Sequence, residues 1–286
     1  MANKHIFAKS EIKDIIDLYV NDLKSMTFIS KKYHIDKSTI KRVLKENNIE
    51  IRDNNIYKEK SFNQNYFKNI STEAQAYWLG FLWGDGSIHT NKLNQYCISL
   101  NLSINDKFHL ENFKKALNSN HKITISKNKY GYLKNSNAVH YSCKYCLRSI
   151  KMYNDLINLG VRNPKKDRTI PNIESSLMSH FIRGYFDADG SLSYSKTNNG
   201  IVSFCGPIEI IQQIKLIIQQ ICNTKAEIYK YKNRNAADYR IGGKNNLIDL
   251  YNYLYKDATI YLKRKKDKWD SLVEVLNGDR YKNIVA

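Results

Sequence analysis

The chain has 286 residues, of which 46 are lysine or arginine and only 27 are acidic, so its net charge is +19. This excess of positive charge predicts a polyanionic partner, most simply nucleic acid; the alternative is a basic protein without such a partner. Apolar windows of about 20 residues and a signal-peptide core are both missing, and five cysteines, an odd number, favour a reducing compartment. We therefore expect a protein of the cytoplasm, nucleoid or an organelle matrix, neither secreted nor bound to a membrane.

Residues 1–47 predict a small all-α domain of three short helices. Ser10, Ser25 and Asp36 stand where N-terminal caps are expected, and apolar residues follow each of them at helical spacing. A tight turn at 34–36 precedes the third helix, which resembles a helix-turn-helix, a motif that lays its recognition helix in the major groove of DNA. The alternative is a helical cap with a solvated basic face. The candidate DNA contacts on the third helix are Lys37, Ser38, Thr39, Lys41 and Arg42.

A polar stretch at 48–70 predicts a linker, after which a helix can start near Ser71 and run into an apolar segment, Trp78–Gly86. A second segment of the same design, Ile182–Gly190, follows later in the chain. Each segment has two small residues four positions apart, which lie on one face of a helix. Faces without side-chain bulk allow two helices to pack backbone against backbone. The predicted helix interface is formed by Gly80, Gly84, Gly184 and Ala188.

Strand and helix patterns alternate between these two segments. Apolar and polar residues alternate over Tyr96–Ser103, which predicts a half-buried strand with one polar face. The next helix is expected to turn Phe108 and the apolar residues that follow it inward. Strand-like residues 121–126, a basic hairpin, a strand around Val139 and a helix over 145–159 complete the series.

The series then repeats. Residues 104 positions apart are similar through the first strands and the next helix, as Ser99 is to Ser203 and Leu110 to Ile214. After the second hairpin a spacing of 100 aligns Leu147 with Leu247. Internal duplication of this length is a fold signal. It predicts an α+β protein with a helix-turn-helix domain at 1–47, a linker at 48–70, repeat one at 71–170 and repeat two at 171–286.

Each repeated helix ends in an aspartate, Asp85 in the first copy and Asp189 in the second. A carboxylate in the last turn faces the negative end of the helix dipole, and two neighbouring carboxylates repel each other further. A divalent cation would relieve both repulsions, and Mg²⁺ prefers oxygen ligands of this kind. The arrangement therefore predicts a metal site where the two helices meet.

These paired segments resemble the motifs of the LAGLIDADG homing endonucleases in their single-chain, two-motif form. The resemblance implies a duplicated αββαββα fold whose two antiparallel sheets form a saddle over double-stranded DNA. It also implies a monomer with internal pseudo-two-fold symmetry. The family's metal-binding aspartate, the eighth motif residue, corresponds to Asp85 and Asp189, with Gly84 and Ala188 beside them in the metal site. The implied cofactor is Mg²⁺ or another divalent cation such as Mn²⁺.

The resemblance also bears on two further positions. The sixth motif residue, often acidic in the family, is Asp187 in the second copy but Trp83 in the first, so it cannot carry a shared role. The family places one basic residue per half near the scissile phosphates, and within the basic runs 164–168 and 263–266 we choose Lys166 and Lys265 as catalytic residues. On the saddle, the candidate DNA contacts are Ser99, Asn101, Lys127, Lys129, Lys196, Lys230, Lys232 and Arg234.

Phosphodiester hydrolysis needs an in-line water, a metal that neutralises developing charge, and stabilisation of the leaving oxygen. We therefore expect a Mg²⁺-dependent, sequence-specific endonuclease that cuts both DNA strands, with a mobile-element role implied by the resemblance. Two alternatives use the same fold, a non-cleaving DNA-binding regulator and an RNA maturase. Regulators of this kind typically lose the acidic motif residue, whereas Asp85 and Asp189 are both present.

Overall fold

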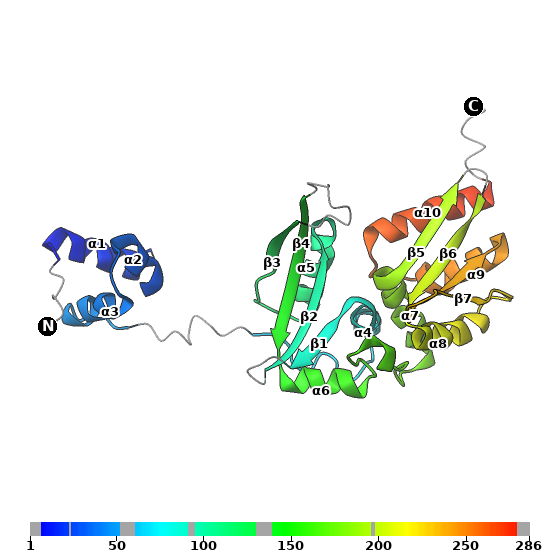
Figure 1. Cartoon of the computed structure of the whole chain (residues 1–286), viewed down its shortest axis with the longest axis horizontal. Helices are drawn as coiled ribbons and strands as arrows, with labels where there is room; N and C mark the ends of the chain where they lie inside the picture. The colour runs from blue at the N-terminus through cyan, green and yellow to red at the C-terminus, as the bar shows by residue number, and fades with distance from the viewer. Residues whose placement is uncertain are drawn as a thin grey trace, which may run out of the picture. The chain divides into compact units, whose positions relative to one another are not determined.

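The computed structural model describes residues 7–22, 24–51, 61–90, 95–129, 139–195 and 198–278. The chain divides into two compact units, Met1–Glu59 and Lys60–Ala286 (Figure 1). Within the described residues, no helix has both the length and the apolar character needed to cross a membrane.

The first unit is a three-helix domain with its own core. Its helices are α1 (Lys9–Val20), α2 (Met26–Tyr33) and α3 (Lys37–Glu46). They pack around apolar side chains that are fully buried, among them Ile15, Ile29, Ile40 and Leu44.

Local hydrogen bonds decide where these helices begin and end. The Ser25 side chain accepts a backbone N–H of α2, as expected of an N-cap, and His34 ends that helix with a left-handed φ of 51°. The cap expected at Ser10 is wrong, because α1 begins one residue earlier and the backbone N–H before it donates to the Glu11 carboxylate, at 2.8 Å. Asp36 occupies the N-cap position of α3 without a side-chain capping bond.

The second unit contains one series of elements twice. The first half consists of α4 (Glu73–Asp85), β1 (Ser87–Thr90), β2 (Tyr96–Ser103), η2 (Ile104–Asp106), α5 (Lys107–Ala116), β3 (Thr124–Lys129), β4 (Val139–Arg148), α6 (Ile150–Asn158) and η3 (Lys165–Asp167). The second half consists of α7 (Ser175–Asp189), β5 (Gly190–Ser195), β6 (Asn198–Gly206), α8 (Ile208–Gln219), β7 (Ile228–Lys230), β8 (Ala237–Gly242), α9 (Lys244–Tyr255) and α10 (Lys263–Asn277).

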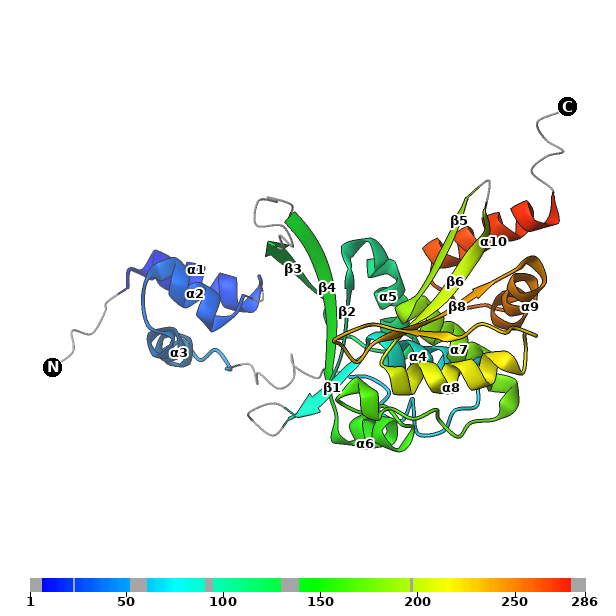
Figure 2. The same ribbon diagram turned by 45° about the vertical axis from the view of Figure 1, so that its right-hand side comes forward.

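Each half forms one four-stranded antiparallel sheet. The strand orders are β1-β2-β4-β3 and β5-β6-β8-β7, so the two halves share one topology. Figures 1 and 2 show the two sheets with α4 and α7 adjacent between them. The predicted α+β fold, a duplicated αββαββα series with a small all-α domain before it, is confirmed. Helix α10 is an addition that the sequence patterns did not predict.

The predicted repeat spacing holds only for the first strands. When Ser99 is aligned with Ser203, the residues of β1 that pair with β2 align with the residues of β5 that pair with β6. In the next helix the spacing falls to 101, because the first half has an extra turn, η2, before α5. Leu110 therefore corresponds in burial to Ile211, and the predicted pairing with Ile214 is wrong.

The second hairpin shortens the spacing further, to 94. Tyr145 on β4 and Tyr239 on β8 face equivalent residues of β2 and β6. The predicted spacing of 100 is therefore wrong, since Leu147 lies in a strand and Leu247 in a helix. The helix expected over 145–159 begins only at Ile150, because burial alternates residue by residue up to 148, which is the period of a strand.

Polar ties join the two halves beside the helix contact. Arg183 on α7 is buried and forms an ion pair of 2.6 Å with Glu73, the first residue of α4. The same Glu73 carboxylate accepts the backbone N–H of Thr259 at 2.8 Å and its hydroxyl at 2.7 Å. Its pKa lies below the usual value, since these hydrogen bonds and Arg183 outweigh the effect of burial. One carboxylate thus fixes α4, α7 and the segment before α10 together.

Candidate functional site

The contact between α4 and α7 leaves no room for a side chain at its glycines. A Cβ atom at Gly80 would lie 1.9 Å from the backbone oxygen of Phe181, and one at Gly184 would lie 2.0 Å from a backbone oxygen of α4. Closer to the helix ends, a Cβ at Gly84 would lie 2.4 Å from that of Ala188. The structure thus brings together the four small residues that the spacing singled out.

Asp85 and Asp189 end these two helices next to each other. The Asp189 carboxylate lies 3.5 Å from the place that a Gly84 Cβ would take, at the end of the opposite helix. Burial, and then the negative charge of Asp189, raise the pKa of Asp85 to about 6. Lys165 on η3 lies 3.3 Å from the Asp189 carboxylate and balances part of that charge.

A buried cation binds the last-turn carbonyl groups of each motif helix. Arg168 donates to the backbone oxygen of Gly86 at 2.7 Å and to the oxygen two residues earlier at 3.2 Å. Lys265 donates to the backbone oxygen of Gly190 at 2.7 Å and to the oxygen two residues earlier at 3.4 Å. Because Gly86 and Gly190 occupy equivalent positions in the two copies, Arg168 and Lys265 are equivalent cations at the negative ends of the two helices.

Sequence reasoning chose one of these cations and missed the other. Lys265 is buried, and burial lowers its pKa to about 8. Lys166, the residue chosen in the first half, is exposed, whereas Arg168 is buried and burial lowers its pKa to about 10. Lys166 and Arg168 both belong to the basic run 164–168. The 3-10 turn of η3 determines which of these two side chains points toward the end of α4. Arg168 therefore replaces Lys166 in the candidate site.

The sixth motif residues differ in chemistry but occupy equivalent positions. Asp187 is buried and accepts hydrogen bonds from Tyr77 at 2.8 Å, from Tyr255 at 2.6 Å and from the backbone N–H of Leu262 at 2.7 Å. Burial raises its pKa despite these donors. In the first half the Trp83 indole donates instead to a backbone oxygen after η3, at 3.2 Å. Each residue therefore ties its motif helix to the segment that closes its half.

A hard divalent cation fits the chemistry of this site. Asp85 and Asp189 supply oxygen donors whose mutual repulsion a cation would reduce, which is the ligand type that Mg²⁺ and Mn²⁺ take. The carbonyl oxygens of Gly84 and Ala188 accept only the longer bonds from Arg168 and Lys265, and each keeps a second lone pair. Within the described residues no group of three or more His, Cys, Asp or Glu side chains converges, so further ligands would be carbonyls, waters or phosphates.

Strand register decides which polar side chains share the outer face of the first sheet. Residues directly opposite each other lie on the same face, so Asn101 shares its face with Lys144 on β4. Arg148, four residues further along β4, lies on that face too and is exposed. Ser99 is only 6% exposed between β1 and β4 and drops out of the candidate DNA contacts. Lys144 and Arg148 were missed, because the expected helix over 145–159 hid the strand alternation.

Among the described residues, the basic residues chosen in the hairpins lie on the core faces of their sheets or in a turn. Lys127 pairs with Tyr141 and Lys230 with Ala237, which places both on the faces that carry the core residues of their sheets. Their assignment to the saddle surface is therefore wrong on register. Lys232 and Arg234 are exposed in the turn after β7, Lys129 ends β3, and Lys196 lies outside the described residues.

The first unit displays its candidate DNA contacts on α3. The apolar face of this helix is buried, and the opposite face is basic. Of the five candidate contacts, Lys37, Ser38 and Lys41 are exposed, and Thr39 and Arg42 are partly exposed.

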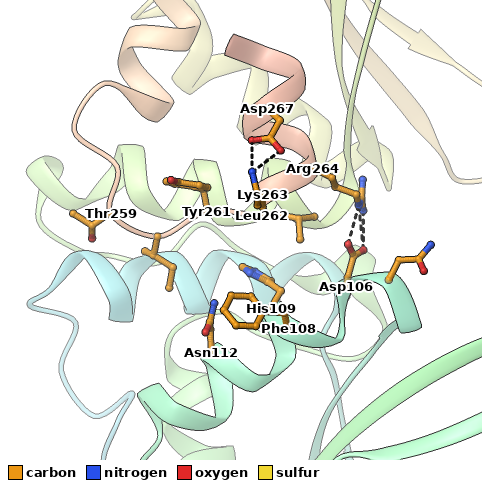
Figure 3. Close-up of a pocket in the computed structure, with 12 residues that line it drawn as sticks. Asp106, Phe108, His109, Asn112, Thr259, Tyr261, Leu262, Lys263, Arg264 and Asp267 are labelled. Carbon is orange, nitrogen blue, oxygen red and sulfur yellow. Dashed lines mark hydrogen bonds and ion pairs between the residues drawn. The ribbon is translucent and has the colours of Figure 1, made fainter. Parts of the chain in front are cut away.

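A cavity of about 680 Å³ lies between α5 and the start of α10 (Figure 3). Its wall includes an ion pair of 3.0 Å between Asp106 and Arg264, which joins the first half to the second. Phe108, which was expected to be buried, lines this cavity and is 67% exposed, while His109 takes the buried place and bonds to a core tyrosine hydroxyl. The rest of the expected apolar face is buried as predicted, at Leu110, Phe113 and Leu117, so the prediction is wrong only at its first position.

Comparison with known proteins identifies part of this architecture. Residues 176–255 match a family model described as LAGLIDADG-like domain. The second half of this chain is a LAGLIDADG-like domain. Its matched range covers most of α7 and the whole second sheet, including Asp189, and ends before Lys265 on α10.

Similar proteins are found over wider parts of the chain. The uncharacterized protein MJ0314 of Methanocaldococcus jannaschii is 28% identical over 178 residues, which are 58% of this chain and 59% of that protein. The chain thus spans about three fifths of the length of this curated relative. The I-LtrWI LAGLIDADG homing endonuclease bound to target DNA is 12% identical with a TM-score of 0.47, over 78% of this chain and 94% of that one. The LAGLIDADG homing endonuclease I-GzeII in complex with a DNA target is 15% identical with a TM-score of 0.47, over 74% of this chain and 92% of that one.

Proposed function

We propose that this protein is a site-specific endonuclease that hydrolyses phosphodiester bonds in both strands of double-stranded DNA. The observation that carries the proposal is the pair Asp85 and Asp189, held together at two helix ends, where burial and then the charge of Asp189 raise the pKa of Asp85 to about 6. The LAGLIDADG-like domain around Asp189 supports it. The net charge of +19 supports a nucleic-acid substrate.

In this proposal each residue near the helix ends has a defined task. Asp85 and Asp189 would hold a divalent cation, which when bound neutralises developing charge on the phosphate and lowers the pKa of a bound water. Arg168 and Lys265 hold the last-turn carbonyls and place positive charge beside the aspartates, where a phosphodiester would approach. Lys165, beside Asp189 and 39% exposed, is within reach of such a phosphate.

The test substrate joins directly the two DNA sequences that flank the gene, as they would be joined in a genome that lacks the gene. This junction is the expected target because the proposed role is that of a homing endonuclease of a mobile element. A plasmid with this junction should be linearised in Mg²⁺ or Mn²⁺ and remain intact in EDTA. Specific binding without cleavage in either metal would instead favour a non-cleaving regulator. Preference for structured RNA over the junction would favour a maturase.

We also propose that the first unit binds DNA beside the cleavage site through α3. A chain that begins at Lys60 should keep metal-dependent cleavage but bind more weakly, with a footprint shortened on one side. The full-length double variant Lys37→Ala, Lys41→Ala should show the same one-sided loss, because it removes two exposed charges of α3 without touching the core. An unchanged footprint in both proteins would contradict a DNA-binding role for this unit.

A further inference from the structure

Side chains of β8 alternate between the two faces of the second sheet. Ala237, Tyr239 and Ile241 are fully buried on the face that packs against α8 and α9. Asp238 and Arg240 therefore lie on the opposite face. On that face the Arg240 side chain is 51% exposed, whereas the Asp238 side chain is only 7% exposed. A buried acid thus lies beneath an accessible guanidinium.

The Arg240 guanidinium is held on one edge and one face. Its Nε and Nη2 atoms donate to the same Asp238 oxygen at 3.2 Å and 2.7 Å. Tyr231 donates its hydroxyl to that oxygen as well, and its hydroxyl oxygen lies 3.4 Å from Nη2. The Tyr229 ring, on the neighbouring strand, lies 5.2 Å from the guanidinium carbon. Among the described residues Nη1 has no acceptor, so the outer edge of the guanidinium remains available.

This arrangement suits recognition by hydrogen-bond geometry better than attraction by charge. Asp238 neutralises Arg240, so the pair adds little to the affinity for a phosphate backbone. Fixing a long side chain in advance reduces the conformational entropy that it would lose on binding. The outer edge of a fixed guanidinium presents parallel N–H groups, which match the O6 and N7 acceptors of guanine in the major groove.

The first sheet lacks this arrangement. At the spacing of 94 that relates β4 to β8, Lys144 occupies the position of Asp238 and Cys146 that of Arg240. Lys144 is an exposed cation with a flexible side chain, which suits a phosphate contact rather than a base contact. The two sheets therefore differ in their means of reading DNA.

Building on the proposed function, we infer that Arg240 reads a guanine in the half-site bound by the second sheet, with Asp238 as its positioning residue. Such a contact predicts a roughly 5- to 150-fold preference for guanine at one position of that half-site. Lys144 and Cys146, which correspond to Asp238 and Arg240 in the first half, predict no such guanine preference in the first half-site.

The test is selection from a randomised DNA duplex library by the full-length protein in EDTA, followed by sequencing of the bound DNA. The wild-type protein should enrich a site with one guanine that Arg240→Ala no longer requires, while the other positions keep their preferences. Asp238→Asn should weaken the same preference, and it should have no further effect when Arg240 is already alanine, because Asp238 acts through Arg240.

Arg148→Ala is the matched control, since it removes one exposed arginine from the outer face of the first sheet. It should weaken binding and reduce the salt dependence but keep the guanine assigned to Arg240. If Arg240→Ala keeps the wild-type preference at every position, the inference is wrong. If the wild-type protein enriches no duplex at all, the proposed function fails together with it.

Discussion

The two halves of the second unit use different side chains for the same structural tasks. Trp83 ties α4 to its closing segment as a hydrogen-bond donor, whereas Asp187 ties α7 to its own closing segment as an acceptor. Arginine holds the last carbonyls of α4, and lysine holds those of α7. The fold therefore requires a bond at each of these places but does not require a particular residue. A duplicated chain can change both partners of such a bond, provided that the bond remains.

Other positions are nearly unchanged between the halves. Gly80 and Gly184 are both glycine because a backbone oxygen occupies the space of any side chain. Asp85 and Asp189 are both aspartate although their proximity is electrostatically unfavourable. Steric exclusion explains the glycines, and the proposed metal explains the aspartates. Four sets of substitutions test how the two halves compare.

The largest effect is expected at the aspartates. Asp85→Asn and Asp189→Asn should each lower the cleavage rate by about 10³-fold or more, because each removes one charged ligand of the proposed cation. DNA affinity measured in EDTA should change little, since the phosphate contacts remain. A variant that cleaves at close to the wild-type rate would show that the two aspartates do not act as a pair.

The second-largest effect is expected at the glycines, where substitution should lower the stability of the fold rather than the rate of the cleavage step. Gly80→Ala and Gly184→Ala should each lower the free energy of unfolding by about 2–3 kcal/mol, because each new methyl group would force the helices apart. Gly242→Ala is the control, since its methyl group would have one neighbour, at 3.7 Å. Chemical denaturation of the three variants measures the difference. Equal stability of all three would contradict the close helix contact.

Substitutions of Arg168 and Lys265 test whether two different residues perform the same task at equivalent places in the two halves. Arg168→Met and Lys265→Met should each cost about 2 kcal/mol of unfolding free energy and slow cleavage, because last-turn carbonyls lose their buried donors. Lys166→Met should change stability by less than about 0.5 kcal/mol, as is usual for an exposed side chain. If Lys166→Met is the most damaging of the three, the replacement of Lys166 by Arg168 in the site is wrong.

The smallest effect concerns a group found in one half only. Burial lowers the pKa of His109 to about 4, from an ordinary value of 6.5. The unfolded chain therefore binds a proton more readily, so stability is lost as the pH falls from about 6.5 toward 4. His109→Gln should reduce this loss by about 1–2 kcal/mol at a pH of about 5.5, relative to the wild-type protein. Parallel pH profiles of the two unfolding free energies would contradict a buried neutral histidine.

How much could be predicted from the sequence depends on how local the responsible signal is. Gly80, Gly84 and Asp85 lie on one short helix, so spacing alone identified the interface and the acidic pair. The strand Tyr96–Ser103 was also placed with its observed bounds, because alternation is a local pattern. These features need no knowledge of distant residues.

The features that the sequence did not predict depend on contacts between distant segments. Choosing Arg168 over Lys166 requires knowing which residue near a 3-10 turn meets the carbonyl groups at the end of α4. The buried place of His109 depends on a hydroxyl of α4, and polarity alone favoured Phe108 there. Asp238 and Arg240 bond each other directly, but the side chains that hold the pair come from Tyr229 on β7 and Tyr231 just after it. Register and packing, rather than composition, determine all three.

The backbone contact between α4 and α7 at Gly80 and Gly184 also limits what length of target the two sheets could span. Helices that touch through backbone atoms cannot slide or tilt without a clash, so the distance between the sheets is fixed. On DNA bound as proposed, the number of base pairs between the two half-sites would be fixed as well. One base pair inserted at the centre of the target would move one half-site by about 3.4 Å along the axis. The protein could then engage only one half-site, whatever the sequence of the other.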